Sequence, residues 1–440
     1  MNRNLRTQKT IEFCLDSFVL VAMSYVFCVV FFFYYGHIIV YFKNGYILTF
    51  CLYMFILGIF LSIYGGFKFR FSKISDIIFS SFISLLLTDL IFYFQSSLNA
   101  NQMLEFSTML FILLIQCICI GLIDLLCWKI FYRFNPAKNT LLIYQNDCEV
   151  FKNKLLRYHD QNFIINKSIQ INSDPTICYS SIKNNDYILL VNVNNVNKRI
   201  LVKYCYSFSK TVFEIPDTYE IITNNAIKFH VIDTPLLELG VFGPSQLSKI
   251  IKRLFDIMLS LISLIILSPI LLICSVAIKL DDNGPVFYKQ VRLTQYGQLF
   301  YIIKFRSMRI HAETDGIAQM AKKDDDRITK VGRILRRYRL DELPQLFNIL
   351  KGDMSIVGPR PERPEIANII YKTLPEFEYR LKVKAGLTGY AQVYGKYNTS
   401  LHDKLLLDLM YIENYSVALD IKIILMTIKT IFIKDSTEGY

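Results

Sequence analysis

Four long apolar stretches open the chain, and they restrict its fold more than any other feature of the sequence. They cover residues 11–35, 46–64, 75–95 and 108–128. Each reaches the length of about 20 residues that a helix needs to cross the hydrocarbon core of a bilayer. A chain inside a bilayer must satisfy its own backbone hydrogen bonds, and a helix does so within one segment. The pattern predicts a four-helix transmembrane bundle over residues 1–135.

Loop charges predict how this bundle is oriented. The segment between the first two stretches contains only Lys43, and the one between the third and fourth contains neither lysine nor arginine. The remaining segments are basic, with Arg3, Arg6, Lys9, Lys68, Arg70, Lys73, Lys129, Arg133 and Lys138. By the positive-inside rule, both ends of the bundle face the cytoplasm. Asp89 and Asp124 lie within or at the end of stretches, where hydrogen bonding between helices is the expected role.

The overall composition agrees with membrane residence. Hydrophobic residues make up 53% of the chain and the mean hydropathy is positive, at +0.33. The net charge of +12 is not accompanied by a nucleic-acid-binding motif, so an anionic membrane surface or phosphate-bearing substrates explain it better. The ten cysteines include no CxxC pair and are expected to be reduced, small hydrophobic residues.

A polar, asparagine-rich region follows at 138–235. Short apolar runs recur in it about twenty residues apart, at 140–144, 163–165, 187–191, 211–215 and 228–232. This spacing leaves room for a helix between strands, so we expect a small Rossmann-like α/β domain with a parallel sheet. The first run ends in Tyr144-Gln145-Asn146-Asp147, without the glycines that let a backbone approach a pyrophosphate. We therefore expect no dinucleotide there.

A fifth apolar stretch, 254–280, contains Ser268-Pro269 at its middle. Basic residues stand at both flanks, with Lys252 and Arg253 before it and Lys279 near its end. Proline removes a backbone hydrogen bond and kinks a helix, and a serine can satisfy the freed carbonyl. We interpret the stretch as a re-entrant membrane helix that enters one leaflet and returns. The alternative is a proline-kinked fifth span.

The chemistry-bearing residues gather between 333 and 361. Four arginines fall within seven residues (Arg333, Arg336, Arg337 and Arg339), and the adjacent carboxylates Asp341 and Glu342 follow them. Pro344 predicts that a helix begins close to Asp341, because proline is tolerated only in the first turn. The segment ends at Gly358-Pro359-Arg360-Pro361, where prolines orient one guanidinium. Guanidinium groups match phosphate oxygens, and carboxylates can bind a divalent metal or attack phosphorus. Phosphoryl transfer suits this set; a solvated face of exchanging ion pairs is the simpler alternative.

From about Lys249 onward the chain resembles the bacterial sugar transferases, which move a sugar 1-phosphate from a nucleotide sugar onto a polyprenyl phosphate. The blocks that carry the resemblance are KRLFDI (252–257), GPVFYKQVR (284–292), KFRSM (304–308), DRITKVGRILR (326–336), LDELPQLFNILKGDMSIVGPRP (340–361), GLTGYAQV (386–393) and LDLMYIENYS (407–416). The resemblance implies a mainly α, monotopic catalytic domain over 245–440 that includes the re-entrant helix at 254–280. Longer members also carry four spans and a Rossmann-like insert, so the whole architecture agrees.

The resemblance also implies roles for individual residues. Asp341 would be the nucleophile and Glu342 its partner, with both near or on a Mg²⁺ ion. Phosphate would be held by Arg336 and Arg360 with help from Lys304, and Asp408 and Tyr411 would lie toward the nucleotide. The chain departs from the family pattern at three places: Asp325-Asp326-Arg327 for Asp-Pro-Arg, Lys384-Ala385-Gly386 for Lys-Pro-Gly, and Tyr390 for tryptophan.

The function expected from this resemblance is transfer of hexose 1-phosphate from a UDP-sugar to undecaprenyl phosphate, with release of UMP. It would be the first membrane step of exopolysaccharide, capsule or O-antigen synthesis, catalysed on the cytoplasmic side of the inner membrane. The expected partners are the two substrates and the lipid bilayer, with a homo-oligomer possible and no nucleic acid. Two alternatives remain open: a nucleotide-sugar epimerase or dehydratase centred on 138–235, and a non-catalytic membrane scaffold. No motif specifies the sugar.

Overall fold

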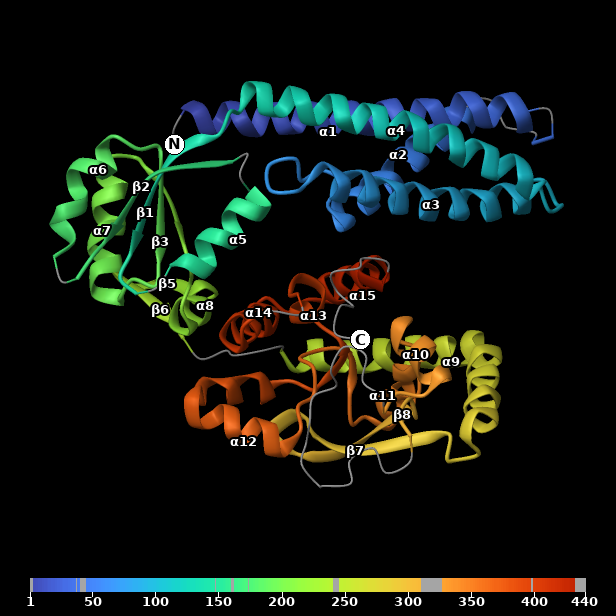
Figure 1. Ribbon diagram of the computed structural model, residues 1–440. Helices are drawn as coiled ribbons and strands as arrows, with labels where there is room; N and C mark the ends of the chain where they lie inside the picture. Colours follow the sequence, from blue (N-terminus) through green and yellow to red (C-terminus); the bar gives the residue numbers. More distant parts are fainter. Residues whose placement is uncertain are drawn as a thin grey trace. The chain divides into compact units, whose positions relative to one another are not determined.

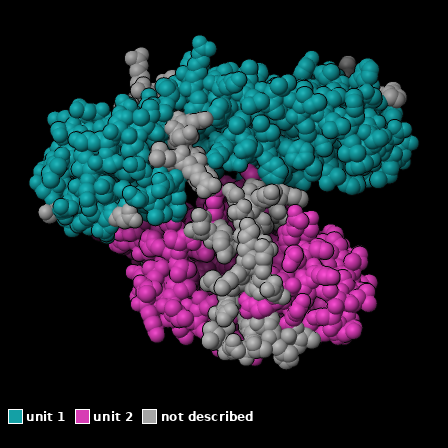
Figure 2. Space-filling view, in the orientation of Figure 1, with its two compact units in different colours: residues 1–215 teal, residues 216–440 magenta. Residues whose placement is uncertain are grey.

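The computed structural model describes residues 3–36, 38–39, 45–146, 148–159, 162–172, 174–239, 245–309, 327–396 and 399–431. The chain divides into two compact units, Met1–Ile215 and Pro216–Tyr440 (Figure 2).

The first unit begins with four long helices (Figure 1). These are α1 (Arg3–Tyr35), α2 (Gly45–Tyr64), α3 (Ile74–Asn99) and α4 (Phe106–Phe134). Together with α9 (Gln246–Asp282) of the second unit, they are long and apolar enough to cross a membrane. The four predicted helices are confirmed, and the long apolar helices with a small α/β region agree with a membrane protein.

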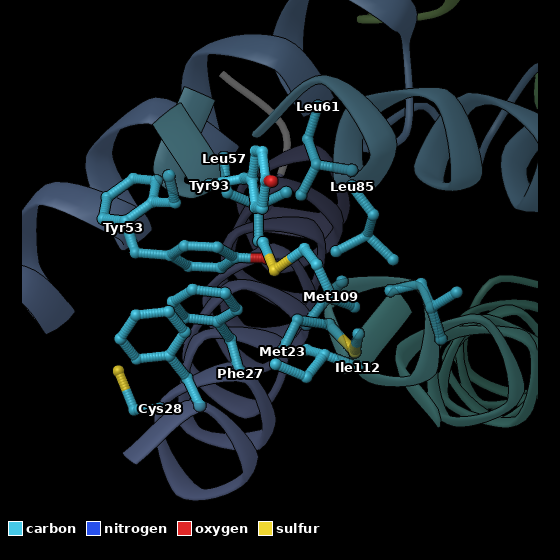
Figure 3. Packing of buried hydrophobic residues seen from close by; sticks show 14 of the residues in the cluster. Met23, Phe27, Cys28, Tyr53, Leu57, Leu61, Leu85, Tyr93, Met109 and Ile112 are labelled. Atoms are coloured by element: carbon cyan, nitrogen blue, oxygen red, sulfur yellow. The ribbon is translucent and has the colours of Figure 1, made fainter. Parts of the chain in front are cut away.

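Aromatic packing and one polar network hold these four helices together. In the core, the rings of Phe27 and Tyr53 stack with centroids 3.9 Å apart, and Figure 3 shows Met23, Phe27 and Leu57 in the same cluster. The Tyr53 hydroxyl donates to Asp89 Oδ1 at 2.8 Å and accepts from Gln116 Nε2 at 2.7 Å. Because these residues come from α2, α3 and α4, the expected role of Asp89 in hydrogen bonding between helices is confirmed.

A four-stranded parallel sheet follows in the same unit, in the order β2-β1-β3-β4. Its strands are β1 (Lys138–Tyr144), β2 (Phe163–Gln170), β3 (Tyr187–Val191) and β4 (Thr211–Glu214). Helices α6 (Tyr179–Lys183) and α7 (Asn195–Ser207) pack on one face, and α5 (Glu149–His159) packs on the other. The predicted parallel α/β region is therefore present.

The apolar run at 228–232 does not join this sheet, so the expectation of a fifth parallel strand is wrong. It forms β5 (Ile227–Val231), which pairs antiparallel with β6 (Thr234–Glu238). Only a two-residue connection separates these strands, and so short a connection permits an antiparallel pair but not a parallel one. The hairpin belongs to the second unit, as does the short helix α8 (Thr218–Asn224) before it.

Helix α9 (Gln246–Asp282) dominates the second unit and contains Pro269. The helix is continuous through this proline, although Figure 1 shows that it bends sharply between its two arms. Proline at 269 leaves the carbonyl of Ile265 without its usual amide donor. The Ser268 hydroxyl donates to that carbonyl at 2.8 Å, as the sequence predicted for the Ser-Pro pair.

Both ends of α9 pack against the same compact group of elements. Near its start, Arg253 donates to the carbonyls of Ile349 and Leu350 at 2.6 and 2.7 Å. At its end, Asp282 forms a forked ion pair with Arg306. Arg306 is buried in this pair, so its charge is compensated inside the unit.

The rest of the unit is mainly helical, with short strands. It comprises β7 (Phe287–Leu293), β8 (Leu299–Phe305), α10 (Lys330–Arg337), a 3₁₀ turn η3 (Leu340–Glu342), α11 (Gln345–Lys351), β9 (Ser355–Val357), α12 (Pro364–Thr373), a 3₁₀ segment η4 (Pro375–Lys382), β10 (Gly386–Thr388), α13 (Tyr390–Tyr394), α14 (Leu401–Glu413) and α15 (Val417–Ile431). In α14 the apolar residues Leu405, Leu409 and Ile412 are fully buried, so this side of the helix packs inside the unit.

Candidate active site

The carboxylates Asp341 and Glu342 lie in the 3₁₀ turn η3, between α10 and α11. A helical turn does begin close to Asp341, as predicted, but it is a 3₁₀ turn, and the α-helix α11 begins only at Gln345 with Pro344 as its N-cap residue. Arg339 adopts a left-handed conformation (φ 55°) that ends one turn and starts the next. Both carboxylates are nevertheless buried, at 9% and 8% exposure.

Glu342 is held by two cations. Lys304 Nζ and Arg360 Nη2 lie 2.9 and 3.0 Å from the same oxygen, Oε1. Burial opposes ionisation of Glu342, but these two cations outweigh it and hold the pKa of Glu342 well below its usual range. Glu342 is therefore a fixed anion that brings Lys304 and Arg360 together.

Lys304 comes from β8, whose position depends on Asn348 of α11. The Asn348 side chain accepts from the Ile303 amide at 2.9 Å and donates to the Tyr301 carbonyl at 2.7 Å. These two bonds occupy the backbone next to Lys304 and fix where its side chain begins. Asn348 belongs to a block that resembles the family, yet nothing in its residue type showed that it would bind a strand 45 residues away.

Asp341 differs from its neighbour, because the described residues give its carboxylate no hydrogen-bond donor. Burial, together with the negative charge of Glu342, raises the pKa of Asp341 to about 6. The charges of Lys304, Arg336 and Arg360 act in the opposite direction. Arg336 is oriented by a 2.8 Å bond from its Nε to the Ser307 hydroxyl. Within the described part of the chain, the site thus combines a carboxylate without a hydrogen-bond donor and three nearby cations.

This arrangement suits attack on phosphorus. A desolvated carboxylate without hydrogen bonds is more nucleophilic than a solvated one, and adjacent cations can receive the oxygens of a phosphate. The structure brings together five of the predicted site residues: Asp341, Glu342, Lys304, Arg336 and Arg360.

The donor set can be tested against the expected Mg²⁺. Among the described residues, no three histidines, cysteines or carboxylates lie close enough to hold a metal ion by themselves. Mg²⁺ is often bound by one or two carboxylates together with substrate phosphates, and Asp341 with the second oxygen of Glu342 would fit that kind of site. The mixed charge run Lys322–Asp326, which includes Asp325 and Asp326, lies outside the described residues.

Asp408 and Tyr411 lie on α14 and are 1% exposed. Asp408 accepts from Arg380 Nε at 2.7 Å. The Tyr411 hydroxyl lies 2.8 Å from Asp420 Oδ1 and 3.2 Å from the Val357 carbonyl oxygen. Both side chains therefore lie inside the unit. Tyr411 contacts the backbone at Val357, and Asp408 is connected through Arg380 to the backbone carbonyl of Arg360. Sequence reasoning missed Arg380, the residue that connects Asp408 to this backbone.

Comparison with known proteins gives a consistent result. The family model for bacterial sugar transferases matches residues 247–434. The chain is 40% identical over 223 residues to the UDP-N-acetylgalactosamine-undecaprenyl-phosphate N-acetylgalactosaminephosphotransferase of Aeromonas hydrophila, covering 50% of this chain and 52% of that protein.

Two proteins named UDP-glucose:undecaprenyl-phosphate glucose-1-phosphate transferase are similar as well. The one from Klebsiella pneumoniae is 38% identical, covering 51% of this chain and 50% of the relative. The one from Caulobacter vibrioides is 36% identical, covering 48% of this chain and 82% of the relative. The chain thus spans about half the length of the first two relatives but most of the third. On this match, the chain belongs to the bacterial sugar transferase family.

Proposed function

We propose that this protein transfers a sugar 1-phosphate from a UDP-sugar to undecaprenyl phosphate and releases UMP. The observation that carries the proposal is the pairing of two buried carboxylates: Asp341, which has no hydrogen-bond donor among the described residues, and Glu342, which holds Lys304 and Arg360. The names of the three relatives all contain undecaprenyl phosphate as acceptor and a UDP-sugar as donor. The sugar differs among them, so the proposal covers the reaction class and leaves the sugar open.

In the first half of the reaction, an Asp341 oxygen attacks the β-phosphorus of the donor. A bond forms between this oxygen and phosphorus, and UMP leaves with the electron pair of the bond from phosphorus to the bridging oxygen. Lys304, Arg336 and Arg360 offset the repulsion between the carboxylate and the doubly anionic donor, which would be costly in a buried site. In the second half, an oxygen of undecaprenyl phosphate attacks the same phosphorus and Asp341 regains its carboxylate.

A Mg²⁺ ion is part of this proposal. Asp341 and the free side of Glu342 would hold it together with donor phosphates, where it would neutralise phosphate charge. Because three cations already surround the two carboxylates, we expect the protein alone to bind Mg²⁺ weakly and the donor to increase the affinity. Isothermal titration with Mg²⁺, with and without a UDP-sugar, measures this difference.

We further propose that α9 is re-entrant and that the second unit lies on the cytoplasmic side of the inner membrane. A straight helix of 37 residues would be about 55 Å long, whereas the hydrocarbon core is about 30 Å thick. Both ends of α9 pack on neighbouring elements of one unit, so a straight span would pull them apart. Exposed apolar side chains line both arms: Leu254, Met258, Leu261, Ile265, Leu272, Ile273 and Val276.

The reaction is tested with purified full-length protein, undecaprenyl phosphate, Mg²⁺ and a panel of UDP-sugars. Release of UMP that depends on one of the sugars is expected, because transfer of the whole sugar phosphate leaves the nucleotide with one phosphate. Release of UDP would instead indicate transfer of the sugar alone. Absence of any product with the whole panel, from a protein that remains folded, would contradict the proposal and favour a scaffold.

A further inference from the structure

We propose that Arg380, anchored by Asp408, is a positioning residue that fixes the backbone around Arg360 and so holds the Arg360 side chain at the carboxylate pair. Asp408 would then act through Arg380 and never touch the substrate. This inference rests on the proposed function for the meaning of Arg360, but the contacts that carry it are independent of the reaction.

Four successive backbone carbonyls, from Pro359 to Glu362, each accept a hydrogen bond from outside their segment. The donors are the Gly386 amide to Pro359 at 2.9 Å, Arg380 Nη2 to Arg360 at 3.1 Å, Arg292 Nη1 to Pro361 at 3.0 Å and the Leu293 amide to Glu362 at 3.0 Å. Two of the four donors are guanidinium groups. A segment with no regular secondary structure is thereby held at every residue.

Arg380 has the most complete set of partners at this place. Its Nε donates to Asp408 Oδ2 at 2.7 Å, its Nη1 lies 3.7 Å from Glu362 Oε1, and its guanidinium sits 4.3 Å from the centre of the Phe377 ring. The Arg380 and Asp408 side chains are only 7% and 2% exposed. A buried charge needs a close partner, so removal of the Asp408 charge would leave Arg380 with only the longer contact to Glu362 and would allow its guanidinium to reorient.

The consequence for the site follows from the length of the Arg360 side chain. The Arg360 side chain is 40% exposed, and its Nη2 lies 3.0 Å from Glu342 Oε1. A long, half-exposed side chain keeps this geometry only if its backbone is fixed. Displacement of a catalytic group by about 1 Å can cost on the order of 100-fold in rate. A rigid segment at 359–362 is therefore a requirement for the cation beside Asp341.

The same contacts argue against direct recognition of the nucleotide by Asp408. Asp408 is only 1% exposed, and its carboxylate already accepts a hydrogen bond from Arg380. Contact with a substrate would require opening of the packing around α14. The position of Asp408 in a block that resembles the family is compatible with contact to the nucleotide and with positioning of Arg380, and the burial of its side chain favours the second role.

The test uses full-length Asp408→Asn, Arg380→Lys and Arg360→Lys variants, and the Asp408→Asn/Arg360→Lys double variant. Asp408→Asn is expected to lower kcat about 10- to 100-fold with little change in KM for the donor. The double variant should be no slower than Arg360→Lys alone, because the two residues act through one element. An increase in KM with kcat unchanged, or additive losses in the double variant, would overturn the proposal.

A second measurement does not depend on turnover. Hydrogen exchange of the Gly386 and Leu293 amides reports on the segment, because their acceptors are Pro359 and Glu362. Asp408→Asn should speed exchange of both amides about tenfold or more, whereas unchanged exchange would overturn the positioning role even if no donor sugar is ever found. The matched control is Asn225→Ala, which removes an exposed bond to the Glu413 carbonyl at the C-terminal end of α14 and should change neither exchange nor rate.

Discussion

At the scale of single residues, two adjacent carboxylates are made different by their neighbours. Glu342 is occupied by Lys304 and Arg360, whereas Asp341 has no hydrogen-bond donor among the described residues. We predict that Asp341→Asn abolishes covalent labelling by a donor with radioactive β-phosphate and lowers turnover by about 10⁴-fold or more. If UMP appears only when both substrates are present, direct displacement by the lipid phosphate is a better mechanism than a covalent Asp341 intermediate.

Glu342→Gln should slow turnover and change the dependence of turnover on Mg²⁺ concentration.

The pKa of Asp341 also predicts how stability depends on pH. Burial raises the pKa of Asp341 from 3.8 to about 6. Between about pH 4 and 6, Asp341 therefore keeps its proton in the folded protein but has lost it in the unfolded chain. Ionised Asp341 therefore destabilises the fold, by up to about 3 kcal/mol, and the loss develops as the pH rises from about 4 to 6. In EDTA, Asp341→Asn should raise the melting temperature at pH 8 more than at pH 4. The control Glu365→Gln, at an exposed carboxylate, should not change the melting temperature in this pH-dependent way. An equal effect of Asp341→Asn at pH 4 and pH 8 would contradict the prediction.

At the scale of elements, features set by neighbouring residues could be predicted from the sequence, whereas contacts between residues distant in the chain could not. Hydropathy predicted the four long helices, and Ser268-Pro269 predicted a kink and a serine bond to a freed carbonyl, which the structure shows to be that of Ile265. The sequence predicted a helix start close to Asp341, whereas α11 begins at Gln345. The left-handed conformation of Arg339, which sets the turn before it, is unusual for arginine and cannot be recognised from the sequence. The bond between Arg380 and Asp408, 28 residues apart, depends on tertiary packing and has no local signal.

The bend in α9 yields a prediction about topology. Reporters fused after Lys138 and at the C-terminus of the full-length chain should both report the cytoplasm if α9 returns to the leaflet that it enters. Replacing Ser268 and Pro269 by leucines restores the missing amide donor and removes the break, which should favour a straight span. In that double variant the C-terminal reporter should move partly to the opposite compartment, while the Lys138 reporter stays. Opposite compartments in the unchanged protein would exclude re-entry.

At the scale of the whole molecule, the residues proposed for catalysis all come from the second unit, Pro216–Tyr440. The Caulobacter relative is matched over 82% of its length by about half of this chain, so a family member exists that consists mostly of the matched part. The first unit carries its own cores, and its Arg70 joins the bundle to the sheet through a 2.9 Å bond to the Tyr187 hydroxyl. These observations point to a first unit that is not needed for the chemistry.

We therefore predict that a chain of residues 216–440, purified in detergent, keeps sugar-phosphate transfer within about tenfold of the full-length protein. A shorter chain of residues 246–440 also loses α8 and the Asn225 bond to α14 at 2.6 Å. It should melt at a lower temperature than the 216–440 chain, because the packing of α8 on α14 is lost, yet it should still form the labelled Asp341 intermediate. Melting curves and single-turnover labelling of both truncations measure these differences. A well-folded 216–440 chain without any labelling would mean that the first unit completes the active site.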